Sequence, residues 1–180
     1  MKKILLLFLF FFSVPIVAQE KINTTNGIIT FEASVPFYEA VEAINKQVYT
    51  FLNTKNGNIS IVAFIKSFHF ERSLMEDHFN ANYMESKKYP KATFKGEIEK
   101  FDLKKINETS ANYFIKGKIN MHGVSKNIRV PATITKNSKN AIVIQSKFSL
   151  NTDDFKIEIP FIVRSKISKT VNVDVNCTLQ

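Results

Sequence analysis

The chain of 180 residues has no tryptophan and a single cysteine, Cys177. One cysteine cannot form an intramolecular disulfide, so the folded state has to be held together by its hydrophobic core. The sequence also has no G-x-S-x-G, H-E-x-x-H, phosphate-loop or dinucleotide-binding pattern. These absences exclude the enzyme classes that carry such motifs, and we expect a protein without catalytic residues or a bound cofactor.

Histidine is also scarce, and the chain contains only His69, His78 and His122. Their spacing matches no metal-ligand motif, although acidic residues lie close to the first two. His78 falls on the apolar side of a predicted helix, and His122 precedes Gly123 in a predicted turn, where a histidine commonly braces the backbone. We predict no metal site and retain a metal-dependent envelope stress protein as the less favoured alternative.

The charge balance is basic, with 25 Lys and Arg against 16 Asp and Glu and a formal net charge of +9. The lysines are spread along the chain and form no cluster, so nothing indicates nucleic-acid binding. A weak attraction to anionic lipid headgroups is compatible with this balance.

A long apolar run is found at the N-terminus, where residues 4–12 follow Lys2 and Lys3. This run is shorter than the roughly 20 residues that span a bilayer. Ile16-Val17-Ala18 fits a signal-peptidase site. The sequence therefore predicts a signal peptide over residues 1–18, one mature domain over residues 19–180, and a periplasmic or secreted location.

Most of the remaining chain alternates between apolar and polar residues, which is typical of strands with one buried face. The alternation predicts strands over residues 28–35, 48–52, 59–70, 92–101, 113–121, 124–134, 142–148 and 170–179, with 157–163 weakly strand-like. About eight strands favour a closed antiparallel β-barrel, because closure removes exposed edges, and a β-sandwich is the alternative. Pro131 is expected at an edge or bulge.

Two segments depart from this pattern. Ser73 and Glu76 fit a capping box, which predicts a helix over residues 74–83 with Leu74, His78 and Phe79 on one face. Residues 37–46 have helical spacing and are expected to form a helix or an irregular turn. The helix and the polar loop over residues 102–110 are the main insertions, so we expect one of them to gate the mouth of the barrel.

The inward positions combine bulky and small side chains. The chain has 17 phenylalanines, whereas Ala33, Ala63, Ala92, Gly96, Gly117 and Ala132 are small and point inward. Small inward residues are compatible with an open channel or with a core that neighbouring rings fill, and the pattern leaves both open. Cys177 lies at an inward position of the last strand, which predicts a small core residue and not a catalytic thiol.

Two motifs carry a resemblance to a known family. Residues 76–96, EDHFNANYMESKKYPKATFKG, and residues 117–131, GKINMHGVSKNIRVP, resemble the two signatures of the YceI-like lipid-binding family. With the surrounding strands, the likeness covers roughly residues 27–179. It implies an extended lipocalin-like β-barrel that holds a polyisoprenoid, a quinone tail or a fatty-acid-like lipid in an apolar tunnel.

The resemblance also implies where a ligand lies. The candidate lining residues are Phe68, Phe70, Phe79, Tyr83 and Phe94, with Gly96 and Gly117 making room for the ligand. The expected function is that of an exported binding or carrier protein, and its main rival is a structural or interaction barrel with a filled core. Homodimer formation is left open.

Overall fold

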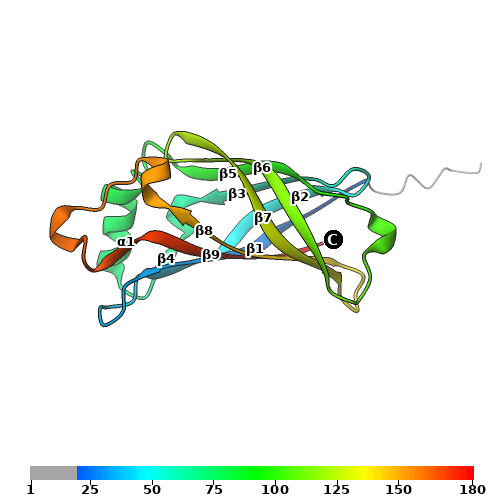
Figure 1. Ribbon diagram of the computed structural model, residues 1–180, viewed down its shortest axis with the longest axis horizontal. Coiled ribbons are helices and arrows are strands. Elements are labelled where there is room, and N and C mark those ends of the chain that lie inside the picture. The colour runs from blue at the N-terminus through cyan, green and yellow to red at the C-terminus, as the bar shows by residue number, and fades with distance from the viewer. Residues whose placement is uncertain (1–19) are drawn as a thin grey trace, which may run out of the picture.

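The structure is a computed structural model that describes residues 20–180 (Figure 1). Its strands are β1 (Lys21–Ser34), β2 (Glu42–Asn53), β3 (Asn58–Phe64), β4 (His69–Phe70), β5 (Lys91–Ile98), β6 (Ala111–Met121), β7 (Val124–Lys136), β8 (Ile142–Asn151) and β9 (Ile167–Leu179). The helix α1 (Ser73–His78) continues into a π-helical turn, η2 (Phe79–Tyr83). Short 3-10 turns are η1 (Ile65–Ser67), η3 (Leu103–Lys105), η4 (Thr152–Phe155) and η5 (Phe161–Val163).

The N-terminal signal peptide predicted for residues 1–18 lies outside the described residues, and its cleavage stays a prediction. Within residues 20–180, none of the helices has the length and apolar character needed to cross a bilayer.

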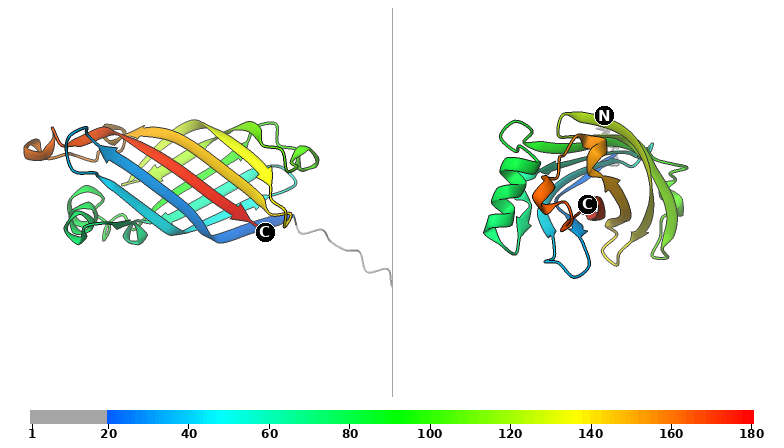
Figure 2. Two further views of the ribbon diagram at one scale, coloured as in Figure 1. Left: turned by 90° about the horizontal axis from the view of Figure 1, so that it is seen from below. Right: turned by 60° about the vertical axis from the view of Figure 1, so that its left-hand side comes forward.

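The strands form a closed barrel in the order β1-β9-β8-β7-β6-β5-β3-β2, and β2 pairs back with β1. All of these pairings are antiparallel. The short strand β4 adds to β2 at one end of the barrel. Figure 2 shows the tilted strands wrapping around a common axis. The expected closed antiparallel barrel is confirmed, because each edge of the sheet has found a partner.

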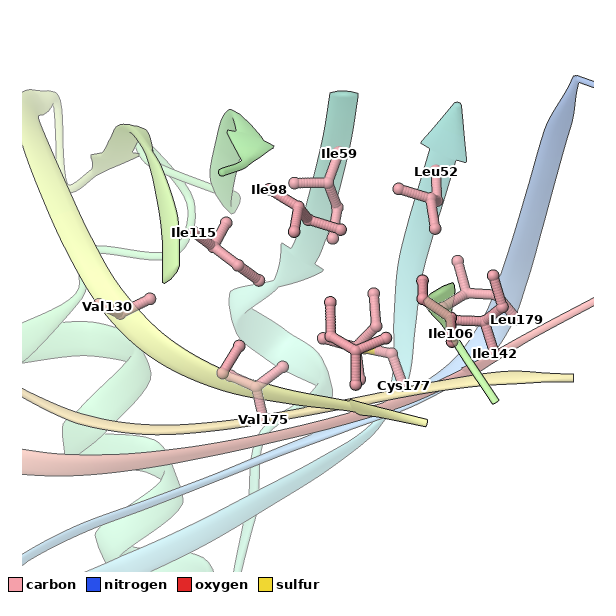
Figure 3. Close-up of a cluster of buried hydrophobic side chains, with 13 residues drawn as sticks. Leu52, Ile59, Ile98, Ile106, Ile115, Val130, Ile142, Val175, Cys177 and Leu179 are labelled. Atoms are coloured by element: carbon pink, nitrogen blue, oxygen red, sulfur yellow. The ribbon is translucent and has the colours of Figure 1, made fainter. Parts of the chain in front are cut away.

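One end of the barrel is sealed by aliphatic side chains. Leu52, Ile142 and Leu179 are at most 3% exposed and meet Ile106, which comes from the loop after η3 (Figure 3). The backbone N–H of Lys136 donates to the carbonyl of Asn107 at 2.8 Å and ties this loop to the wall. The loop over residues 102–110 is therefore a plug at the end opposite α1, and the expectation that it gates the mouth is wrong (Figure 1).

The ladder between β7 and β8 is short compared with the length of the two strands. Backbone pairing is confined to residues 133–136 of β7 and 142–145 of β8. Just beyond it, the Ser146 hydroxyl donates to the Pro131 carbonyl at 2.7 Å. Proline has no N–H to donate, so its position beside the end of a ladder fits the edge character that the sequence predicted. Beyond these residues β7 and β8 have no backbone pairing with each other, and η4 lies against both strands.

Residues 37–46 do not form a helix. The chain turns at residues 36–38 and enters β2 at Glu42, where Ala43 and Asn45 are buried. The side-chain amide of Asn45 donates to the carbonyl of Phe64 at 3.1 Å and so fixes β2 to the end of β3. This segment is a tight turn followed by a strand whose side chains alternate between the inner and outer face. The combination places apolar residues at spacings that also fit one face of a helix, which explains the prediction. Residues 157–163 likewise form part of a loop with η5 and not a strand.

The helix is confirmed, but its cap and its buried face differ from the prediction. Its N-cap is Arg72, without a side-chain cap, and the Glu76 carboxylate instead accepts the backbone N–H of Phe70 at 3.2 Å. Leu74 is 64% exposed and His78 is also exposed. The half-buried positions of the helix and the following π turn include Met75, Phe79 and Tyr83. Because β4 precedes α1 directly, its pairing with β2 sets the rotation of the helix.

Candidate functional site

The barrel contains a cavity of about 450 Å³, and its lining reaches Met75 and His78 at the end that carries α1. This volume lies within the usual range of small-molecule sites, roughly 300–1,000 Å³. The deep wall is aliphatic and includes Ile59, Ile115 and Val175, which Figure 3 shows pointing inward. Inward side chains such as Phe148 and Val173 keep partial exposure because they face the hollow. The interior is therefore open, which decides between the two alternatives that the sequence pattern allowed.

An aromatic cluster forms one wall of the cavity near α1. The ring centroid of Phe31 lies 5.4 Å from those of Phe68 and Phe79 and 5.8 Å from that of Phe70. Phe79 comes from the π turn, and its ring lies 5.1 Å from that of Phe70. Edge-to-face and offset contacts at these separations stabilise aromatic clusters. The helix thus contributes its main apolar contact to the cavity wall.

The structure brings five of the seven predicted ligand-binding residues to this cavity, namely Phe68, Phe70, Phe79, Tyr83 and Phe94. Burial raises the pKa of the Tyr83 phenol, which keeps that group neutral. Phe31 also lines the cavity but was not among the predicted residues. Its signal was present in the sequence, because it occupies an inward position of the first alternating strand.

Gly96 and Gly117 are not among the residues that line this cavity, so the ligand-binding role that the resemblance implied for them stays a prediction. They pair with each other across β5 and β6. A Cβ at either position would lie 2.7 Å from Cζ of Phe94, so the Phe94 ring already covers both glycines. The missing side chains let the two backbones and the Phe94 ring pack closely on this side of the strands.

Charge is confined to the mouth of the cavity. Among residues 20–180, Glu39 is the acidic side chain and Lys166 the lysine or arginine side chain that line the cavity. Glu39 belongs to the β1–β2 turn and Lys166 to the loop between η5 and β9, and both segments lie at the α1 end (Figure 2). His78 of α1 also lines this end. A ligand with a polar end therefore finds matching groups at the mouth and only apolar or neutral groups deeper inside.

The histidines lie apart in separate local contacts. Nδ1 of His69 is 3.3 Å from Oε2 of Glu76 on the surface. Nδ1 of His122 donates to the carbonyl of Phe155 at 2.9 Å, and its ring packs against Tyr89 with centroids 4.7 Å apart. Within residues 20–180, no group of three His, Cys, Asp or Glu side chains is placed to hold a metal ion. His122 fastens η4 to the β6–β7 turn, which is the bracing role that its place before Gly123 predicted.

Cys177 is buried, as its inward position predicted, and lines the deep wall of the cavity. Its Sγ lies 3.2 Å from the Thr50 hydroxyl. Burial raises the pKa of the Cys177 thiol, and the weaker opposing effect is the hydrogen bond with Thr50. A thiol with a raised pKa stays protonated at neutral pH and is a poor nucleophile.

We expect native Cys177 to react with the charged thiol reagent DTNB at least about a thousandfold more slowly than the unfolded chain, because reaction then requires an open state of very low population. The measurement is the release of thionitrobenzoate with and without guanidinium chloride. Fast reaction of the native protein would contradict this burial and would show that the cavity admits a charged aqueous reagent.

Comparisons with known proteins agree with this architecture. A model of the YceI-like domain matches residues 19–179. No curated protein matches the chain. A polyisoprenoid-binding domain from Saccharophagus degradans, implicated in plant cell wall breakdown, superposes with a TM-score of 0.77 at 16% identity and covers 89% of this chain and 98% of its own.

Two further solved structures are similar. BcnA from Burkholderia cenocepacia has a TM-score of 0.69 at 15% identity and covers 86% of this chain and 96% of its own. A YCEI protein from Campylobacter jejuni has a TM-score of 0.53 at 20% identity, with 86% and 85% covered. These superpositions establish that the proteins share a fold, and at identities this low they establish nothing more.

Proposed function

Because the chain belongs to the YceI-like domain family, we propose that it is an exported carrier that holds a long apolar ligand inside the barrel. The ligand class is a polyisoprenoid, a quinone tail or a fatty-acid-like lipid. The similar domain from Saccharophagus degradans is described as polyisoprenoid-binding, which supports this class. The single observation that carries the proposal is an open cavity of about 450 Å³ with an apolar deep wall.

The energetics favour a long chain over a short one. Each methylene removed from water contributes roughly 0.8 kcal/mol, so ten methylenes contribute about 8 kcal/mol. Association itself costs about 4–15 kcal/mol in lost freedom of motion. The deep wall has no charged groups and offers few polar contacts that could offset this cost of association. Tight binding therefore requires a tail of about ten carbons or more.

The ligand binds with its tail toward the plug and its polar end at the mouth. The sealed end is closed by Leu52, Ile106 and Leu179, whereas Glu39 and Lys166 stand at the open end. Burying a charged head against the aliphatic end would leave it without partners, which is costly. Lys166 favours an anionic head, and Glu39 lets neutral hydroxylated heads bind as well.

Passage through the mouth is controlled by α1 and η2, which carry Met75 and Phe79 on the cavity wall. Export through the predicted signal peptide would place this carrier in a periplasm or outside the cell. The proposed role is sequestration without catalysis, and the open cavity weighs against the rival of a structural barrel with a filled core. A metal-dependent role is less favoured because the histidines lie in separate contacts.

The test is organic extraction of the purified protein followed by mass spectrometry, together with native mass spectrometry of the intact protein. We expect one molecule of a lipid or isoprenoid for each barrel. A protein that is empty as purified and stays empty after incubation with quinones, polyprenols and fatty acids would overturn the proposal. A zinc measurement on protein made without a histidine tag checks the metal alternative in the same preparation.

A further inference from the structure

The loop between β8 and β9 exposes two large apolar side chains at the open end of the barrel. Phe161 is 83% exposed and Ile162 is 87% exposed. They lie side by side in η5, and Figure 1 shows this loop extending farther than the rest of the open end. At the same end, the β1–β2 turn holds Phe37 with a φ of 70° and a fully exposed ring. A bulky residue at positive φ is uncommon, and here it presents another apolar group to solvent.

The part of this loop that follows Pro160 is basic, whereas Asp153, Asp154 and Glu158 precede it. Between Pro160 and Thr170 the sequence has Arg164, Lys166 and Lys169 and no acidic residue. Lys169 pairs with Asp153 at 2.8 Å, whereas no carboxylate within residues 20–180 lies within salt-bridge distance of Arg164 or Lys166. Apolar tips next to cations are the composition that binds the interface of an anionic bilayer.

The charges also orient the contact. Glu71, just before α1, and Asp77, on α1, are exposed and would be repelled by anionic headgroups. These charges favour the η5 loop over α1 as the part of the open end that faces an anionic surface. Figure 2 shows these two elements on different sides of the opening.

The exposed loop is continuous with the cavity. Val163, Lys166 and Ile167 line the mouth, although Phe161 and Ile162 only a few residues earlier point to solvent. A bilayer touched by the tips would thus lie directly against the opening of the cavity.

We propose that the η5 loop, with Phe161 and Ile162 as its apolar tips and Arg164 and Lys166 as its cations, docks the open end of the barrel on an anionic phospholipid bilayer. Docking brings the mouth to the membrane, so that an apolar chain passes between bilayer and cavity with little exposure to water. The identity of the transferred chain rests on the proposed carrier function. The docking of the loop on the bilayer does not.

The absence of tryptophan gives a direct test, because Phe161→Trp introduces the sole indole of the chain. The vesicles contain phosphatidylcholine with about one third phosphatidylglycerol, and pure phosphatidylcholine vesicles serve for comparison. We expect the emission of the Phe161→Trp protein to shift to the blue with the anionic vesicles and to be quenched by brominated acyl chains. The matched control is Phe51→Trp, on β2 with 50% exposure, and it should show neither change.

Sedimentation with the same vesicles tests the unlabelled protein. The double variant Phe161→Ser/Ile162→Ser should lose at least about tenfold in partitioning, Phe51→Ser should not, and added salt should weaken wild-type binding. Undiminished binding of the double variant, or equal binding to pure phosphatidylcholine, would overturn the proposal. Self-association in lipid-free solution that the double variant abolishes would overturn it in favour of a dimer face.

Native mass spectrometry without vesicles separates the two proposals. If the double variant still contains the same lipid that extraction finds in the wild type, but no longer sediments with vesicles, docking is a separate property of the loop. A wild-type protein that contains no lipid, accepts none and still binds the anionic vesicles would retain the docking proposal and remove the carrier function.

Discussion

Replacing Val173 by phenylalanine should lower the affinity for a long-chain ligand by roughly 50-fold, because the new ring displaces about three methylenes worth about 0.8 kcal/mol each. Val173 lines the cavity on β9, opposite Phe31 of β1 and Phe148 of β8 in the strand register. The added ring enters empty space, so the free energy of unfolding should stay equal or rise. A fluorescent fatty acid measures the affinity, and native mass spectrometry measures occupancy as purified.

The control for this variant places the same ring on the other face of the same strand. Thr178 is exposed on the outer face of β9, so Thr178→Phe should leave ligand binding unchanged. If Val173→Phe binds as tightly as the wild type, the ligand does not pass β9, and the proposed path of the tail is wrong. If both variants lose ligand, the effect comes from disturbance of β9 and not from filling of the cavity.

Replacing Gly96 by alanine should lower the free energy of unfolding by about 3 kcal/mol and Tm by roughly 6–12 °C. The new Cβ would lie 2.2 Å from the carbonyl oxygen of Lys116 and 2.9 Å from Cα of Gly117. Both are backbone atoms of β6, so the strands have to separate before the methyl group fits. Thermal unfolding followed by circular dichroism measures the effect.

Two further variants locate the cause of this loss. Lys95→Ala, on the exposed side of the same strand, should change the free energy of unfolding by less than about 0.5 kcal/mol. Adding Phe94→Leu to Gly96→Ala should recover only part of the loss, because the ring is removed but the clash with the Lys116 carbonyl remains. A Gly96→Ala protein with normal stability and weakened ligand binding would return Gly96 to the ligand-binding role that the resemblance implied.

The two ends of the barrel differ in what they contribute to stability and to ligand binding. At the sealed end, Leu52, Ile106 and Leu179 supply the packed core that a chain without disulfides needs. At the open end, packing gives way to a cavity, an aromatic wall and exposed tips. Stability and binding thus rest on different residues, and for this reason variants such as Val173→Phe and Gly96→Ala are expected to affect one property without the other.

Several misinterpretations of the sequence share one cause. The spacing of Ser73 and Glu76 fits a capping box, yet the Glu76 carboxylate accepts from Phe70 of β4, which the sequence gives no reason to place there. The polar loop over residues 102–110 reads as a surface insertion, yet Ile106 within it is 3% exposed. In both cases a contact between distant segments outweighed a valid local signal.

The sequence by itself predicted most of the strands from the alternation of apolar and polar residues. The two motifs indicated the family, and through this resemblance they favoured the barrel over a β-sandwich. It also placed Cys177 at an inward position and, through the resemblance, five aromatic residues in the wall of a ligand cavity. Only the tertiary structure decided what those inner faces meet. Alternation with a period of two residues indicates which face of the sheet a side chain points to. It does not indicate whether that side chain meets an aromatic ring, a backbone or empty space. That is why Phe94 covers Gly96 and Gly117 while Val173 faces a cavity, although all four positions belong to the same alternating pattern.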